Sequence, residues 1–306
     1  MKSEIIMYHY VRGLENSILP KIKALELKKF IDQIYFLKKN YNIISMSQFL
    51  RKDLISNKPN CLLTFDDGYK DHYENVFDIL IKNKISGSFF VPAEIVKKNN
   101  TLLDVNKIHV ILASADEDTI FDKLIYYYNK LKPEISIEKY VKRIDLKSRF
   151  DTPKTILIKR LLQKALPVEI REKICDNLLR DFSDFSIEEL NKDFYMTLDN
   201  AKEMASYGMH FGSHGKSHFW FESLNKSQQE SEILGSLNFL NQIYQGSKFD
   251  LTICYPYGSY NKITLDLLKK YNFKAGFTTV PKKFDNNIDS FHTIPRYDTN
   301  DYYPMV

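Results

Sequence analysis

The sequence has few of the features that mark secreted, membrane-spanning or zinc-finger proteins. Its three cysteines, Cys61, Cys175 and Cys254, are odd in number and widely spaced, and no Cys-x-x-Cys pair occurs. We therefore expect buried thiols in a reducing compartment instead of a disulfide framework or a cysteine metal site. No run of 18 apolar residues occurs, and the first ten residues hold no sustained apolar stretch. These absences predict a cytoplasmic protein without a transmembrane segment, unless an export signal has been removed.

Charged residues of one sign are not concentrated anywhere along the chain. Its 306 residues include 44 lysines and arginines against 39 aspartates and glutamates, which gives a formal net charge of +5. Because the lysines are scattered, we expect no nucleic-acid-binding surface. Internal repeats and low-complexity linkers are also absent from the sequence. The length accommodates one large α/β domain or two smaller ones.

An apolar segment that ends in two carboxylates and a glycine is the most informative feature present. Leu62 and Leu63 predict a buried strand, with Asp66 and Asp67 at its carboxyl end and Gly68 in the turn that follows. Such strand ends carry the chemistry of α/β barrels and open sheets. Adjacent carboxylates repel each other unless a cation or a shared proton relieves them. The pair therefore indicates a metal site with one ligand and one free base, and a solvated Asp-Asp-Gly turn is the alternative.

Histidines are scarce, and their distribution supports the metal interpretation. Three of the seven fall within residues 210–218. His214 and His218 are four positions apart, so both imidazoles can reach one ion from a helical turn or a tight loop. Residues 209–212 have the pattern of a short strand, which places these histidines past a strand end, like the aspartates. One carboxylate and two imidazoles form the ligand set of a catalytic zinc or similar divalent ion.

These motifs resemble those of the NodB-homology polysaccharide deacetylases, carbohydrate esterase family 4. The matching segments, in chain order, are Thr64-Phe65-Asp66-Asp67-Gly68, the strand at 84–92, His214-Gly215-Lys216-Ser217-His218 and Tyr255-Pro256-Tyr257-Gly258. They lie within residues 1–92 and 195–298. The resemblance implies an irregular (β/α) barrel and a deacetylase activity, with the first aspartate as general base and the second as a metal ligand.

Strands and helices alternate along most of the chain. We expect strands at about 4–8, 41–45, 61–65, 85–91, 209–212, 251–255, 275–279 and 291–295, and helices at about 25–38, from 48, 73–82, 197–206, 227–243 and 262–270. Ser47 and Thr197 are the expected helix N-caps. Eight strands alternating with helices predict an α/β fold, a distorted parallel barrel, which the resemblance also implies.

Residues 93–194 interrupt this alternation. Their apolar spacing predicts helices at about 104–115, 117–131, 154–165 and 168–181. We therefore expect a barrel of residues 1–92 and 195–306 with a mostly helical insertion at 93–194. The insertion either shapes a substrate groove on the catalytic side or acts as a buttress with no role in substrate choice.

Roles follow for the residues that match the motifs. A divalent ion held by Asp67, His214 and His218 would activate water and polarise an acyl oxygen, with Asp66 as the general base. Zinc is the expected metal, and cobalt, nickel and iron are alternatives. The tetrahedral intermediate also needs a backbone donor, for which we expect the N–H of Tyr257.

The chain departs from the family pattern at two positions. Many relatives carry an arginine just before the Tyr-Pro-Tyr-Gly turn, where this chain has Cys254, so Arg296 is the candidate to tune Asp66. The usual C-terminal Leu-x-His motif is not evident. His9 and His292 are the candidate general acids, and we favour His9, as in the biofilm-type poly-N-acetylglucosamine deacetylases. The residues expected around the substrate are Tyr255, Pro256, Trp220 and Arg296, although Trp220 fits a core role equally well.

These assignments predict a metal-dependent deacetylase that removes the N-acetyl group of an amino sugar in a glycan or glycan precursor and releases acetate. Its expected partner is an N-acetylated glycan or an amino-sugar conjugate. Two alternatives stay open. One is a catalytically inactive carbohydrate-binding protein on the same fold, and the other is an O-deacetylase of a small sugar conjugate.

Overall fold

The computed structural model describes residues 2–15, 17–52, 57–96 and 101–302. The chain divides into two compact units. The first contains Met1–Gly13, Ala24–Asn99 and Asn191–Val306, and the second contains Leu14–Lys23 and Asn100–Leu190. Within the described ranges, no helix combines the length and the apolar character that crossing a bilayer requires.

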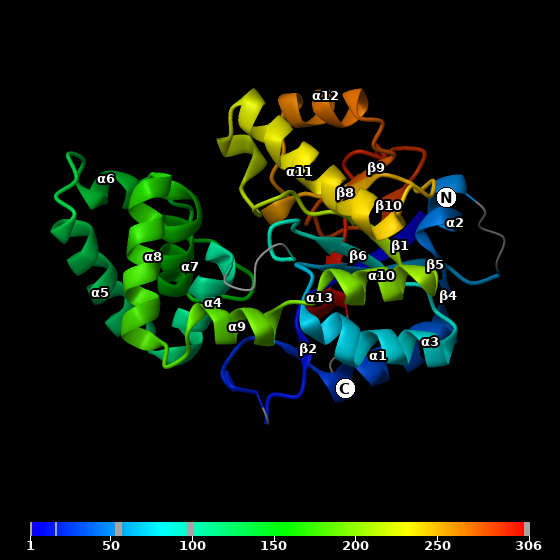
Figure 1. Cartoon of the computed structure of the whole chain (residues 1–306), viewed down its shortest axis with the longest axis horizontal. Helices are drawn as coiled ribbons and strands as arrows, with labels where there is room; N and C mark the ends of the chain where they lie inside the picture. The colour runs from blue at the N-terminus through cyan, green and yellow to red at the C-terminus, as the bar shows by residue number, and fades with distance from the viewer. Residues whose placement is uncertain (1, 16, 53–56, 97–100, 303–306) are drawn as a thin grey trace. The chain divides into compact units, whose positions relative to one another are not determined.

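The first unit is built on a curled, predominantly parallel sheet, which has nine strands among the described residues (Figure 1). They are β1 (Lys2–Tyr8), β4 (Asn42–Ile43), β5 (Asn60–Asp66), β6 (Ser88–Val91), β7 (His210–Ser213), β8 (Thr252–Cys254), β9 (Ala275–Phe277), β10 (Phe284–Asp285) and β11 (Tyr297–Asp298). The order is β10-β1-β5-β6-β7-β8-β9, with β11 on β1 and β4 on β5. A separate ribbon pairs β2 (Val11–Arg12) with β3 (Leu25–Glu26).

The segment after β10 links the two ends of the strand order. Ile294 forms a parallel bridge with Phe277 of β9, and Tyr297 of β11 pairs with Ile6 of β1. The sheet therefore curls into the distorted barrel that the sequence predicts. The expected last strand at 291–295 lies later and is split, because Pro295 has no N–H to donate to a ladder.

An aromatic ladder fixes the register of four neighbouring strands. Tyr8, Phe65, Phe89 and Phe211 are paired residues on β1, β5, β6 and β7. Their rings follow one another at centroid distances of 5.0, 4.8 and 5.6 Å. Because side chains alternate along a strand, the residue after Phe65, which is Asp66, must face the opposite side of the sheet.

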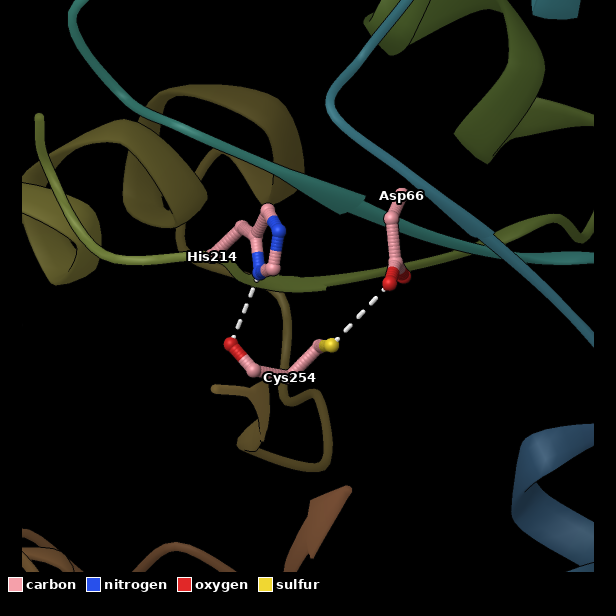
Figure 2. Close-up of side chains that lie close together, drawn as sticks. All are labelled: Asp66, His214 and Cys254. Carbon is pink, nitrogen blue, oxygen red and sulfur yellow. Dashed lines mark hydrogen bonds between the residues drawn. The ribbon is translucent and has the colours of Figure 1, made fainter. Parts of the chain in front are cut away.

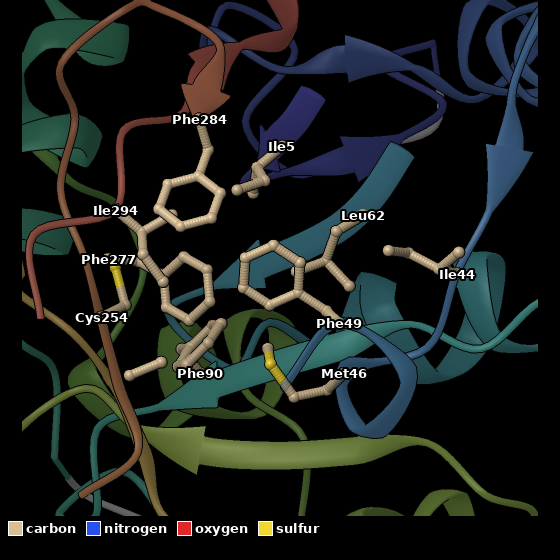
Figure 3. Close-up of a cluster of buried hydrophobic side chains, with 11 residues drawn as sticks. Ile5, Ile44, Met46, Phe49, Leu62, Phe90, Cys254, Phe277, Phe284 and Ile294 are labelled. Atoms are coloured by element: carbon tan, nitrogen blue, oxygen red, sulfur yellow. The ribbon is translucent and has the colours of Figure 1, made fainter. Parts of the chain in front are cut away.

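That opposite side is the packed interior of the barrel. Its core cluster, drawn in Figure 3, contains apolar residues from the sheet, from the helix α2 (Met46–Arg51) and from the segment between β10 and β11. Leu62 on β5 and Phe90 on β6 contribute to it and are fully buried. Buried parallel strands have such continuous apolar runs. The polar site residues therefore lie at the carboxyl ends of the strands, next to this apolar core.

Helices accompany the strands of the first unit. They are α1 (Leu27–Asn40), α2 (Met46–Arg51), α3 (Asp78–Asn83), α10 (Leu198–Ser206), α11 (Lys226–Tyr244), α12 (Lys262–Lys270) and α13 (Thr299–Tyr302), with a π-helix at His72–Phe77 and 3₁₀ turns at Phe221–Ser223 and Pro256–Gly258. Thr197 caps α10, as predicted. The expectation for Ser47 is wrong: Ser45 caps α2 through a capping box with Gln48, so the helix begins two residues earlier.

The second unit is helical. It contains α4 (Asp104–Ser114), α5 (Glu117–Lys130), α6 (Ile137–Val141), α7 (Pro153–Arg160), a π-helix at Leu161–Ala165 and α8 (Val168–Phe182). The α9 helix (Ile187–Phe194) starts in this unit and ends in the first. Residues 14–23 also belong here, where Lys23 pairs with Asp151 at 2.8 Å. The short helices α6 and α9 were not predicted, because one or two turns carry little periodicity.

Candidate active site

Backbone conformation singles out three residues at the carboxyl end of the sheet. Eight non-glycine residues in the described ranges have positive φ, a conformation that side chains disfavour. Five of these lie at or directly after helix C-caps, where a left-handed residue is common: Lys52, Lys84, Lys132, Gln245 and Asn272. The other three are Asp67 (φ 74°), His218 (φ 61°) and Tyr257 (φ 57°). Strain of this kind concentrates at functional sites.

Asp66 ends β5 and forms a two-point ion pair with Arg296. Arg296 Nη1 donates to Asp66 Oδ1 at 2.9 Å, and Nη2 donates to Oδ2 at 2.7 Å. Burial is the largest influence and would raise the pKa of Asp66, but the charge and hydrogen bonds of Arg296 together with the charges of His214 and His9 outweigh it and lower this pKa to about 2. The carboxylate is therefore ionised at neutral pH. Arg296 takes the tuning role expected from the sequence, but it is fully buried, which corrects its expected role in substrate binding.

Asp67, His214 and His218 come together at one point. The Nε2 atoms of both imidazoles lie 3.2 Å from Asp67 Oδ1, and Tyr69 donates its hydroxyl to Oδ2 at 2.8 Å. All three residues are at least 93% buried. Burial alone would raise the pKa of Asp67, but the imidazoles beside its carboxylate outweigh it and hold this pKa well below its usual value.

The hydrogen bonds around these atoms fit a cation among them. His214 Nδ1 lies 2.8 Å from the carbonyl oxygen of Cys254, which only accepts, so Nδ1 carries a proton. In the neutral ring, Nε2 then directs a lone pair toward Asp67 Oδ1, which makes no hydrogen bond to any group in the described part of the chain. One carboxylate oxygen and two imidazole nitrogens that converge in this way match the donor set of a divalent ion.

A second set of donor atoms lies nearby but fits a cation poorly. Asp66, His214 and Cys254 also bring a possible ligand atom each within 4.8 Å of one another, and Figure 2 shows Cys254 between the other two. Cys254 Sγ lies 3.2 Å from Asp66 Oδ2 and 2.7 Å from Arg296 Nη2. A guanidinium at that distance would repel a second cation, so we assign the metal set to Asp67, His214 and His218.

An aromatic pair borders the imidazoles. The rings of Trp220 and Tyr257 stack at 4.6 Å and 10°, and Tyr257 meets His218 edge-on at 4.7 Å. Both stacked residues are half-buried. Tyr255 and Pro256 are instead buried, and the Tyr255 hydroxyl donates to the carbonyl of His292 at 2.7 Å. Their expected contact with substrate is corrected, because the core contains both side chains.

The two candidate acids lie in different surroundings. His9 directly follows β1, and its charge is among those that lower the pKa of Asp66 and Asp67. The ring of His292 lies 3.0 Å from the carbonyl of Phe273 instead. His72 is fully buried and donates from Nε2 to the His9 carbonyl at 2.8 Å. His9 therefore interacts electrostatically with both aspartates, whereas the ring of His292 contacts a backbone carbonyl.

Sequence reasoning missed some residues that shape the site. Tyr69 contacts Asp67, and the backbone carbonyl of Cys254 orients His214. Tyr69 lies two residues beyond Asp67, so its position in the motif was a usable signal. No sequence signal marks a backbone carbonyl contact. Glu232 is a charged residue on the buried face of α11. A carboxylate at an apolar position of the helical pattern could have indicated a polar contact there.

Known proteins share this fold and these motifs. A family model described as polysaccharide deacetylase matches residues 55–117 and 185–276, about half of the chain. A putative polysaccharide deacetylase, YxkH of Bacillus subtilis (strain 168), is 35% identical over 88 residues, which are 28% of this chain and 30% of that protein. The match thus spans less than a third of the relative's length.

Solved structures resemble the whole chain at low identity. The Streptococcus pyogenes deacetylase PplD, solved in complex with acetate, superimposes with a TM-score of 0.60 at 18% identity, covering 97% of this chain and 92% of that one. IcaB from Ammonifex degensii gives 0.57 at 16%, covering 97% and 91%. These likenesses confirm the barrel fold. With the match of the family model to half of the sequence, they establish that this chain belongs to the polysaccharide deacetylase family.

Proposed function

We propose that this protein is a metal-dependent deacetylase that hydrolyses the N-acetyl group of an amino sugar in a glycan or glycan precursor, releasing acetate and a free amine. The observation that carries the proposal is the convergence of Asp67 Oδ1 with the Nε2 atoms of His214 and His218, 3.2 Å from each, beside the ionised Asp66. Family membership and the acetate complex of PplD support the reaction class.

Asp67, His214 and His218 would hold the ion, for which zinc is the best match to nitrogen and oxygen ligands. A bound divalent ion lowers the pKa of water and polarises an acyl oxygen. Asp66 accepts the proton of the attacking water. Arg296 holds both oxygens of Asp66 in place, which keeps the base ionised at the expense of basicity.

The remaining steps need a donor for the oxyanion and an acid for the amine. We assign the oxyanion donor to the backbone N–H of Tyr257, in the strained turn after β8. His9 protonates the departing amine, because it lies within the electrostatic reach of both aspartates. Trp220, stacked on Tyr257, offers a half-buried aromatic face for a sugar ring.

The test is acetate release from chitin oligosaccharides by the zinc-loaded protein, with the variant Asp66→Asn and the exposed control Asp78→Asn beside it. Asp66→Asn should keep its fold and bound zinc and lose at least 100-fold in turnover, because the amide cannot take the proton. Asp78→Asn should match the wild type. Unchanged turnover in Asp66→Asn would refute the assignment of the base.

The same assay separates the alternatives. Acetate release from O-acetylated sugars without release from N-acetylated ones would replace the N-deacetylase by an O-deacetylase. Glycan binding by the zinc-loaded protein without release of acetate from either substrate would replace it by a carbohydrate-binding protein.

A further inference from the structure

A buried carboxylate on α11 contacts the loop that carries both histidines. Glu232 is 5% exposed, and its Oε2 atom accepts the backbone N–H groups of Lys216 at 2.9 Å and Ser217 at 2.8 Å. Consecutive backbone N–H groups that converge on one oxygen form a cradle for an anion. The protein fills this cradle with its own side chain.

The loop needs such a restraint because its backbone is strained at two places. Gly215 has φ +71°, and His218 has φ 61°. Disfavoured conformations persist only where the surroundings hold them. On its other side, the loop is held by main-chain bonds, in which the carbonyls of Gly215 and Lys216 accept the N–H groups of Ala93 and Glu94.

Glu232 packs tightly against the histidine loop. A Cβ atom at position 215 would lie 3.0 Å from Glu232 Oε2, so the glycine permits the approach. One helical turn further along α11, Ser236 Oγ meets Ser213 Oγ at 2.7 Å. Ser213 ends β7 and directly precedes His214. The same face of α11 therefore anchors the strand end and the loop.

We propose that Glu232 is a positioning residue that sets the histidine loop in the geometry that brings His214 and His218 to Asp67. The part of this inference that concerns the metal rests on the proposed function. Glu232 touches neither the substrate nor the reacting atoms. Its effect is to fix the ligand imidazoles before a cation arrives, and outer partners of this kind change metal affinity by about 10–100-fold.

The test compares Glu232→Met, which keeps the length and removes the acceptor, with Glu232→Gln, whose single carbonyl oxygen can still accept both N–H groups. Glu230→Met is the matched control. Glu230 lies on the same helix, but its carboxylate binds Lys270 and not the histidine loop. Hydrogen exchange of the metal-free proteins is followed in a peptide covering residues 214–218. Zinc affinity is measured by competition with a chromogenic chelator.

Glu232→Met should exchange faster in this peptide and bind zinc about 10–100-fold more weakly, while Glu232→Gln and Glu230→Met stay near the wild type. Exchange in Glu232→Met equal to the wild type would overturn the inference, as would equal loss in Glu230→Met. If the wild type itself bound no zinc, the proposed metal dependence would fail, and the exchange data would still decide the role of Glu232 in the loop.

Discussion

Arg296 and Asp66 form a two-point ion pair although 230 residues separate them in the sequence. The guanidinium approaches from the segment before β11, and the carboxylate from the end of β5, with β1 between these two strands. Cys254 lies directly before the Tyr255-Pro256-Tyr257-Gly258 turn, and its sulfur contacts both partners. The positive charge beside Asp66 is therefore supplied from the segment before β11.

Replacing Arg296 should show how much its two hydrogen bonds to Asp66 contribute to turnover and to stability. Arg296→Lys keeps a charge but cannot make two parallel bonds, so we expect a folded protein with turnover reduced by about 10–100-fold. Arg296→Met leaves Asp66 buried without its partner and should lower the free energy of unfolding by about 3–5 kcal/mol. Denaturant titration beside the exposed control Arg51→Met measures this loss, and equal stability of both variants would contradict the pair's importance.

Cys254 should tolerate a smaller polar side chain and reject a larger one. Cys254→Ser keeps a hydroxyl between Asp66 and Arg296, and we expect turnover within about tenfold of the wild type. Cys254→Arg would place a second guanidinium in a fully buried position within the core cluster, so it should destabilise the fold by several kcal/mol. Melting temperatures of the two variants, compared with the wild type, check this order.

The stability of the protein should fall in mild acid because of His72. Burial lowers the pKa of His72 to about 4, while the unfolded chain titrates near 6.5. Between these two pKa values the unfolded state binds a proton and the folded state does not. The free energy of unfolding therefore drops by roughly 3 kcal/mol from pH 6.5 to pH 4. About one pH unit above 6.5, where the unfolded chain no longer binds this proton, the contribution becomes constant.

Denaturant titrations between pH 4 and 7 measure that slope. His72→Gln keeps an amide donor for the His9 carbonyl and removes the titration, so its slope should be shallower. Some slope should persist, since burial also lowers the pKa of His210. A slope in His72→Gln as steep as in the wild type would show that His72 does not titrate in this window.

The acid can be identified by comparing leaving groups. His9→Gln should lower turnover of an N-acetylated sugar by about 100-fold or more, because the amine must be protonated as it leaves. An aryl acetate, whose leaving group needs no proton, should be affected much less. His292→Gln, with its ring on the Phe273 carbonyl in the wild type, is the control, and a selective loss there would transfer the role to His292.

Trp220 should affect substrate binding more than chemistry. Trp220→Ala removes the exposed face of the stacked pair and should raise KM for oligosaccharides by about tenfold or more while changing kcat little, whereas Trp220→Phe restores part of the affinity. Tyr35→Ala serves as control, because Tyr35 is 64% exposed on α1. A loss confined to kcat would instead indicate that the pair supports His218 or Tyr257.

The strands and the polar ends of the sheet were predictable because their signals are local. A continuous apolar run located β5, and a short alternating pattern located β7. The residues at and after the ends of these strands identified Asp66, Asp67, His214 and His218. These residues needed no knowledge of long-range pairing, since the carboxyl ends of parallel strands meet at one edge.

Contacts across the barrel were harder to predict. Whether Arg296 faces Asp66 or the substrate depends on how Pro295 splits the last strand, and the sequence did not separate the two. The burial of Tyr255 and His72 follows from packing against distant residues, Tyr255 on the His292 carbonyl and His72 beside Phe65 and Phe89. Residue type alone had suggested a substrate contact for Tyr255.

The position of β1 has a consequence for synthesis on the ribosome. One edge of β1 pairs with β5, which is made early, while its other edge waits for β10 and β11 near residue 298. A nascent chain with Asp67, His214 and His218 already translated would still lack Arg296 and would expose that unpaired edge. Free edges invite pairing with other chains. A segment late in the sequence therefore both supplies Arg296 and covers the second edge of β1, so nascent chains that still lack this segment should depend most on chaperones.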